Sequence, residues 1–162
     1  MEATYAVDPA LLGGAIVEMD GTPSDKFEVL KTLNREFVSI ARILSRLKFS
    51  GAYFQGRHPP GTTPYCDQAL LKITPETPYA ELEDLQDLAD TTLVTRFEVP
   101  GRPPCLMVVN CDYKKDRTIS VKAPAPMLRF DALARTWSPV GSEFDLALVR
   151  GSGVLLRFEQ KK

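Results

Sequence analysis

The last third of the chain consists of short apolar segments separated by turn residues, and this pattern limits the possible folds more than any other feature. The segments are Leu93–Val99, Cys105–Asn110, Thr118–Val121, Met127–Asp131, Phe144–Val149 and Val154–Phe158. Their lengths suit β-strands, and short strands with regularly recurring turns are typical of sandwiches and barrels. The sequence therefore predicts a mainly β fold, with an antiparallel β-sandwich over residues 51–162.

The sandwich should bury one apolar face of each strand. The side chains expected between its two sheets are Leu106, Val108, Leu128, Phe130, Leu148, Leu155 and Phe158. Residues 106–109 are apolar without interruption, which indicates a central strand covered on both faces. Turns are predicted at Trp137-Ser138-Pro139 and at Gly151-Ser152-Gly153, the second as a hairpin turn.

One long amphipathic α-helix is predicted before the strands. Ser24 or Asp25 can begin it, and apolar residues follow at helical spacing, at Phe27, Leu30, Leu33, Phe37, Ile40, Leu44 and Leu47. Gly51 should end the helix after about 24 residues. Residues 1–50 thus form an N-terminal loop and helix, whose apolar stripe must be buried on the β-domain or on a second copy of the chain.

The helical region also carries specific sequence phrases. Residues 13–23 read Gly-Gly-Ala-Ile-Val-Glu-Met-Asp-Gly-Thr-Pro, and residues 30–36 read Leu-Lys-Thr-Leu-Asn-Arg-Glu. Together with the crossing from Leu44–Leu47 to Gly51–Phe54 and the strands that follow, these phrases resemble a known arrangement. It is the last barrel helix and the C-terminal β-sandwich of TIM-barrel glycoside hydrolases of the β-galactosidase type.

This resemblance implies a non-catalytic accessory domain that braces a catalytic barrel or mediates oligomer contacts. A retaining glycosidase needs two carboxyl groups about 5 Å apart. In the resembled enzymes these groups come from barrel strands, which would lie upstream of Met1. Glu18 is the one acidic residue near a barrel-like strand end, and no second carboxylate accompanies it. We therefore expect no enzymatic activity from this chain.

Other catalytic and metal-binding patterns are weak. His58 is the single histidine, and its proline-bounded loop favours a solvated side chain. The scattered Cys66, Cys105 and Cys111 lack the paired spacing of a zinc site and are expected to be reduced thiols. The acidic residues between Glu76 and Asp90 lack the spacing of a calcium-binding loop. No metal or other cofactor is predicted.

Charge and hydropathy limit the possible partners. The chain has 20 Lys and Arg against 21 Asp and Glu, so it lacks the basic surface typical of nucleic-acid-binding proteins. No segment reaches the roughly 20 apolar residues of a membrane-spanning helix. The first residues lack a basic region followed by an apolar run, so no signal peptide is predicted, and the sequence points to no cellular compartment.

Aromatic residues provide the alternative function, a carbohydrate-binding module. Sugars stack their C–H faces on exposed aromatic rings, and Trp137, Tyr53, Tyr65 and Tyr113 are the candidates. For Trp137 we favour a structural role, in which the ring packs over the edge of the sandwich. Exposure of Trp137 beside other aromatic rings would favour binding, whereas burial would favour bracing.

Overall fold

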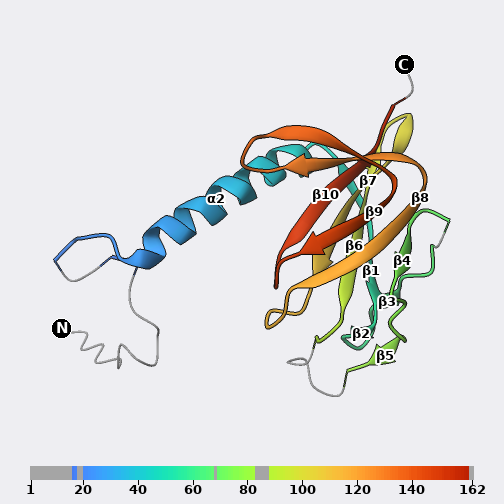
Figure 1. Ribbon diagram of the computed structural model, residues 1–162, viewed down its shortest axis with the longest axis horizontal. Helices are drawn as coiled ribbons and strands as arrows, with labels where there is room; N and C mark the ends of the chain where they lie inside the picture. The colour runs from blue at the N-terminus through green and yellow to red at the C-terminus, as the bar shows by residue number, and fades with distance from the viewer. Residues whose placement is uncertain (1–15, 18–19, 68, 83–87, 161–162) are drawn as a thin grey trace.

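The computed structural model describes residues 16–17, 20–67, 69–82 and 88–160 (Figure 1). Within them, helix α2 (Asp25–Leu44) precedes a series of strands. The strands are β1 (Lys48–Gln55), β2 (Arg57–His58), β3 (Thr63–Pro64), β4 (Lys72–Thr74), β5 (Ala80–Glu81), β6 (Thr92–Val99), β7 (Arg102–Asn110), β8 (Arg117–Asp131), β9 (Thr136–Leu148) and β10 (Gly153–Phe158). The prediction of a mainly β fold preceded by one helix is confirmed.

Eight strands form one continuous, largely antiparallel sheet in the order β3-β1-β6-β7-β10-β8-β4, with β9 pairing along β8. The β1–β3 pair is parallel, and β2 and β5 form a separate parallel pair. The chain thus builds a mixed sheet in which the antiparallel pairs predominate.

The long strand β8 folds this sheet into two layers. Its first half pairs with β4 at residues 120–122, and its second half pairs with β10 at residues 127–129. The pairing with β9 shifts register between Lys122 and Met127, and Pro124 and Pro126 lie in this gap. A register shift bends a strand, and the sandwich-like architecture follows from that bend. Figure 1 shows β8 and β9 arching across the sheet that contains β6, β7 and β10.

The main core lies between the layers. Its buried side chains are Tyr65, Leu71, Ile73, Val94, Leu106, Val108, Ile119, Val121, Ala123, Met127, Leu146, Leu148, Val154, Leu156 and Phe158. The predictions for Leu106, Val108, Leu148 and Phe158 are therefore confirmed.

Three other core predictions are wrong in detail. Phe130 and Leu155 are buried, but they belong to a second cluster on the opposite face of the sheet, with Cys105. Leu128 is half-buried, and the fully buried Met127 takes its place in the main core. Along β8 the residues that face the main core are the odd-numbered Ile119, Val121, Ala123 and Met127, so the alternation of the strand places Leu128 and Phe130 on the other face.

The helix is shorter than predicted. It ends at Leu44, and the amides of Arg46 and Leu47 donate to the carbonyls three residues earlier, at 3.2 and 2.9 Å. This tight turn leads directly into β1, so Gly51 lies inside a strand and does not end the helix. The last turns of the helix cover the outer face of the sheet. The helix residues that pack against the second cluster there are Ile40, Ile43 and Leu44.

The remainder of the helix projects beyond the strands (Figure 1). Leu33 and Phe37, which belong to the predicted apolar stripe, are 57% and 68% exposed. Their burial on the β-domain is not observed, because the helix diverges from the sheet before it reaches them.

Two predicted turns also differ. Trp137-Ser138-Pro139 lies within β9, and the turn occupies residues 132–135, where Arg135 has a φ of 58°. The Gly151–Gly153 turn joins β9 to β10, but β10 pairs with β7 and β8. It is therefore a connection between non-paired strands and not a hairpin turn.

Candidate functional site

Two of the four candidate aromatic residues come together in one pocket. Tyr53 of β1 and Tyr65, which follows β3, make an edge contact with ring centres 6.4 Å apart. They line a cavity of about 250 Å³ at the margin of the main core. The other lining residues are Thr63, Pro64, Cys66, Asp67, Leu70, Val94, Arg96 and Leu106.

The position of Tyr53 depends on a glycine. Gly51 lies two residues earlier on the same strand, so the two residues face the same side of the sheet. A Cβ atom at Gly51 would lie 2.4 Å from the hydroxyl oxygen of Tyr53 and 2.6 Å from Cζ. The ring of Tyr53 therefore occupies space that only a glycine leaves open.

Tyr65 is held more rigidly. Its hydroxyl group lies 2.9 Å from the carbonyl oxygen of Asp67 and 3.0 Å from that of Leu71, and it can donate to either. Burial raises the pKa of the Tyr65 phenol well above its usual range, and the negative charge of Asp67 adds to this effect. The ring is only 8% exposed, so Tyr65 forms an apolar wall whose polar end points into the protein.

A charged pair lies at the edge of this pocket. Nη1 of Arg96 is 3.6 Å from Oδ2 of Asp67, and the two side chains are 40% and 46% exposed. An ion pair so exposed adds little to the free energy of folding. Its side chains do, however, present hydrogen-bond donors and acceptors beside an apolar cavity, and the two charges cancel.

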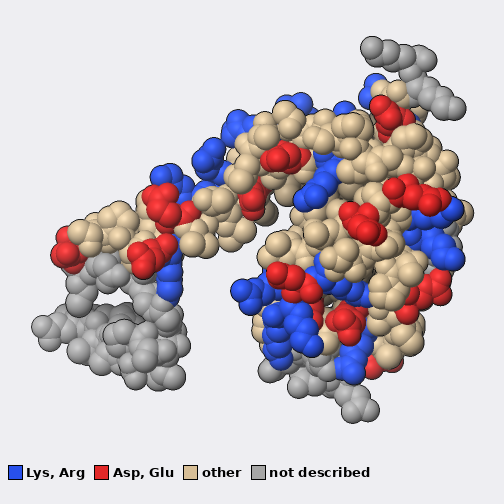
Figure 2. Space-filling model, viewed as in Figure 1, with Lys and Arg blue, Asp and Glu red and all other residues tan. Residues whose placement is uncertain are grey.

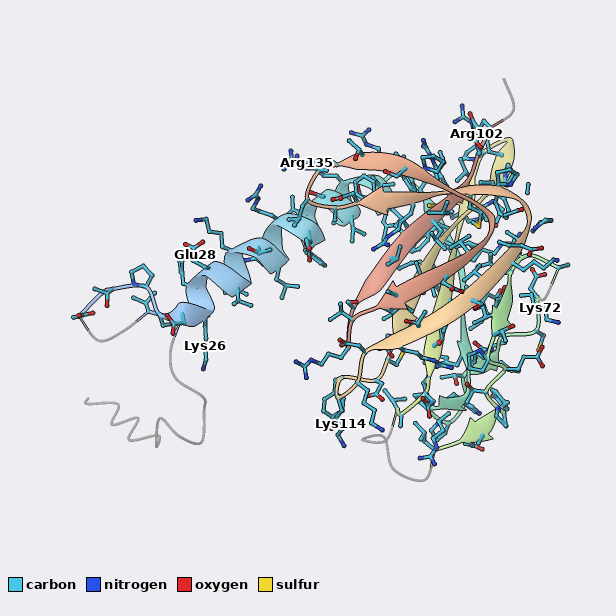
Figure 3. The ribbon with its side chains drawn as sticks, in the orientation of Figure 1. Lys26, Glu28, Lys72, Arg102, Lys114 and Arg135 are labelled. Carbon is cyan, nitrogen blue, oxygen red and sulfur yellow. The ribbon has the colours of Figure 1, made fainter. Side chains whose placement is uncertain are left out.

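The other two aromatic candidates lie elsewhere. Trp137 is half-buried in the second cluster, where its ring contacts Phe130 and the Arg157 guanidinium, whose Cζ is 4.2 Å from the ring centre. Tyr113 is 58% exposed in the turn between β7 and β8, beside Lys114. Figure 3 shows Lys114 at the end of the β-domain away from Arg135, which lies at the β8–β9 turn next to the helix. The four residues therefore do not form one surface.

A second candidate surface is the exposed part of α2. Val29, Leu33 and Phe37 follow one another at four-residue intervals and are 70%, 57% and 68% exposed; we call them the helix stripe. Next to it, a groove of about 420 Å³ is lined by Ile16, Phe27, Leu30, Lys31, Asn34, Arg35, Val38 and Arg135. Figure 2 shows lysine and arginine side chains along one edge of the projecting helix.

His58 departs from its prediction. It is 2% exposed, on β2, and its ring stacks on Tyr79 with centres 3.6 Å apart. Nδ1 lies 2.9 Å from the hydroxyl oxygen of Thr62, whereas Nε2 is buried and has no hydrogen-bond partner among the residues that the structure describes. The histidine is not solvated because Tyr79, itself bonded through its hydroxyl to the Thr62 carbonyl, covers it.

The remaining sequence candidates are one acidic residue and three cysteines. Glu18 lies outside the described residues. Cys66 is exposed, Cys111 is half-buried and Cys105 is buried, all as free thiols, and burial raises the pKa of Cys105 to about 11. In the part of the chain that the structure describes, no group of His, Cys, Asp and Glu is arranged to hold a metal ion. No helix among the same residues is both long and apolar enough to cross a membrane.

Sequence reasoning missed Asp67, Arg96 and Gly51 as parts of the pocket. Asp67 and Arg96 are far apart in the sequence, and they meet because β1 pairs with β6 and the segment after β3 returns over this pair. The spacing of Gly51 and Tyr53 on one strand was a visible signal, although it is a weak one. Comparisons with known protein families, with curated proteins and with solved structures find no match for this chain.

Proposed function

We propose that this chain is a non-catalytic accessory domain that docks through the helix stripe onto a second folded surface. The surface would be the barrel of a glycoside-hydrolase-like protein or a second copy of the chain. The observation that carries the proposal is the contrast along α2: Ile40 and Leu44 pack on the chain's own sheet, whereas Leu33 and Phe37 are exposed.

The energetics favour an occupied stripe. Full burial of a Val, Leu or Phe side chain contributes about 1.5–3 kcal/mol each, so covering Val29, Leu33 and Phe37 would contribute several kcal/mol. Monomeric proteins rarely expose large contiguous apolar patches, and such patches commonly mark interaction sites. The resemblance to the end of a glycosidase barrel supports the same surface, because the helix would then be the last helix of that barrel.

Sedimentation of the double variant Leu33→Gln/Phe37→Gln tests the docking surface. We expect the unchanged chain to self-associate as its concentration rises, and the variant to remain monomeric with an unchanged thermal midpoint. Arg42→Gln, an exposed polar position of the same helix, is the matched control and should behave like the unchanged chain. Reading the frame directly upstream of the Met1 codon tests the barrel form. A chain that stays monomeric, with no barrel encoded upstream, would refute the proposal.

Carbohydrate binding is a second candidate function. It is supported by one specific observation, the pocket in which Tyr53 and Tyr65 lie beside Asp67 and Arg96. Trp137 does not support carbohydrate binding, because the Arg157 guanidinium lies over its ring. We therefore restrict this candidate to the tyrosine pocket.

A further inference from the structure

We infer that the tyrosine pocket holds one neutral sugar ring, with Asp67 and Arg96 binding its hydroxyl groups. The inference rests on the second candidate function, carbohydrate binding, and it specifies the ligand and the residues that recognise it. It does not depend on docking through the helix stripe, which lies on the part of α2 that projects beyond the strands.

The size of the cavity limits the ligand. At about 250 Å³ it is smaller than the range of about 300–1,000 Å³ usual for drug-sized ligands. One ring fits a space of this size, whereas a longer ligand would have to extend past the edge of the pocket. The ligand is therefore a single sugar unit, either free or at the end of a longer chain.

The walls suit the faces of a sugar ring. Tyr53, with the small exposed part of Tyr65, supplies aromatic surface, and the half-buried Leu70 supplies aliphatic surface. Val94 and Leu106, which are 1% and 0% exposed, lie behind them. The C–H groups of a sugar can pack on such surfaces, which a purely polar solute could not do favourably. The pocket thus selects a ligand with apolar faces and a polar perimeter.

The polar groups at the edge select against charge. Asp67 can accept hydrogen bonds from two hydroxyl groups, and the planar guanidinium of Arg96 donates several in one plane. Because the two groups form an ion pair, a charged ligand would have to displace one of them. A neutral polyhydroxylated ring can instead bond to both without breaking the pair.

Cys66 offers a direct reporter. It lines the same cavity and is the exposed member of the three free thiols. A sugar in the pocket should therefore slow its alkylation by N-ethylmaleimide, which mass spectrometry of the labelled peptide can follow. The exposed thiol needs no substitution for this measurement.

The experiment titrates the full chain with methyl glycosides of neutral hexoses and pentoses, and with short neutral oligosaccharides. Ligand-observed NMR and Cys66 alkylation are measured in parallel. We expect saturable binding of at least one methyl glycoside, with matching protection of Cys66. Asp67→Asn and Tyr53→Leu should each weaken binding about tenfold, because each removes a recognising group.

Glu98→Gln is the matched control. Glu98 pairs with Lys48 at 3.3 Å on the same two strands, but neither residue lines the pocket, so its affinity should be unchanged. Oligosaccharide binding that survives Asp67→Asn and Tyr53→Leu would overturn this inference but leave carbohydrate binding intact. No saturable binding of any glycoside by the folded chain would overturn both.

Discussion

Leu155 and Leu156 are neighbours on β10, yet they are buried in different cores. Leu156 lies in the main core between the layers, whereas Leu155 lies in the second cluster beneath the end of α2. The same alternation holds on β7, where Leu106 faces the main core and Cys105 the second cluster. The uninterrupted apolar run of β7 thus does correspond to a strand covered on both faces.

The main core should dominate the stability of the chain. Phe158→Ala removes a ring that is 7% exposed, and we expect it to lower the free energy of unfolding by about 3–5 kcal/mol. Urea denaturation followed by circular dichroism measures the loss. Leu128→Ala, at a half-buried position outside both clusters, is the control and should cost less than half as much.

The helix should divide into a stabilising end and a neutral end. We expect Leu44→Ala to cost about 1–3 kcal/mol, because Leu44 packs on the second cluster. Phe37→Ala should change stability by no more than about 0.5 kcal/mol, because the ring is largely exposed. Equal losses for the two variants at low protein concentration would mean that the exposed part of the helix packs within the single chain.

Stability should fall at alkaline pH. Burial raises the pKa of Cys105 from 9.0 to about 11, and the thiol lies 3.2 Å from the carbonyl oxygen of Leu156. The neutral thiol is therefore favoured in the folded state, so its contribution is complete below pH 9 and is lost as the pH rises towards about 11. The loss is up to about 3 kcal/mol. The raised pKa of Tyr65 acts in the same direction at higher pH.

Unfolding curves of the unchanged chain and of two cysteine variants, measured across this pH range, test the contribution of Cys105. Cys105→Ala should show a shallower loss of stability above pH 9, whereas the exposed Cys66→Ala should follow the unchanged chain. Identical slopes for all three proteins would show that Cys105 does not control the alkaline transition.

Gly51 should control the tyrosine pocket. Gly51→Ala places a methyl group where the ring of Tyr53 now lies, so the ring must move, at a cost of about 1–3 kcal/mol. In a Tyr53→Leu background the same substitution should cost much less. The difference between the two costs, measured as a double-mutant cycle, isolates the contact. Additive costs would show that the ring of Tyr53 does not depend on Gly51.

The sequence located most of the strands but not their continuity. The sequence predicts Thr118–Val121 and Met127–Asp131 as two separate segments, and Pro124 and Pro126 lie between them. The structure keeps them in one strand, since the prolines fall in the stretch of β8 where no pairing to β9 is recorded. Pro139 is tolerated within β9 for a related reason. Among the described residues β9 pairs only with β8, so its other edge forms no strand pairing there.

The site was harder to predict than the fold. Local patterns identified Tyr53 and Tyr65 as aromatic candidates, but their grouping depends on which strands pair. The burial of His58 similarly depends on Tyr79, which comes from a different segment of the chain. The helix ended early because β1 begins at Lys48 in register with Glu98 of β6, a long-range pairing that no helical pattern reveals.

Because β8 is bent, the sandwich consists of one continuous sheet that folds over on itself, and not of two separate sheets. Both layers are hydrogen-bonded to the same backbone, β4 to one half of it and β10 to the other. Separating the layers would require straightening that backbone near its two prolines. The chain should therefore resist being split into complementary halves, and a cut within residues 123–126 should harm it more than a cut in the turn at residues 132–135.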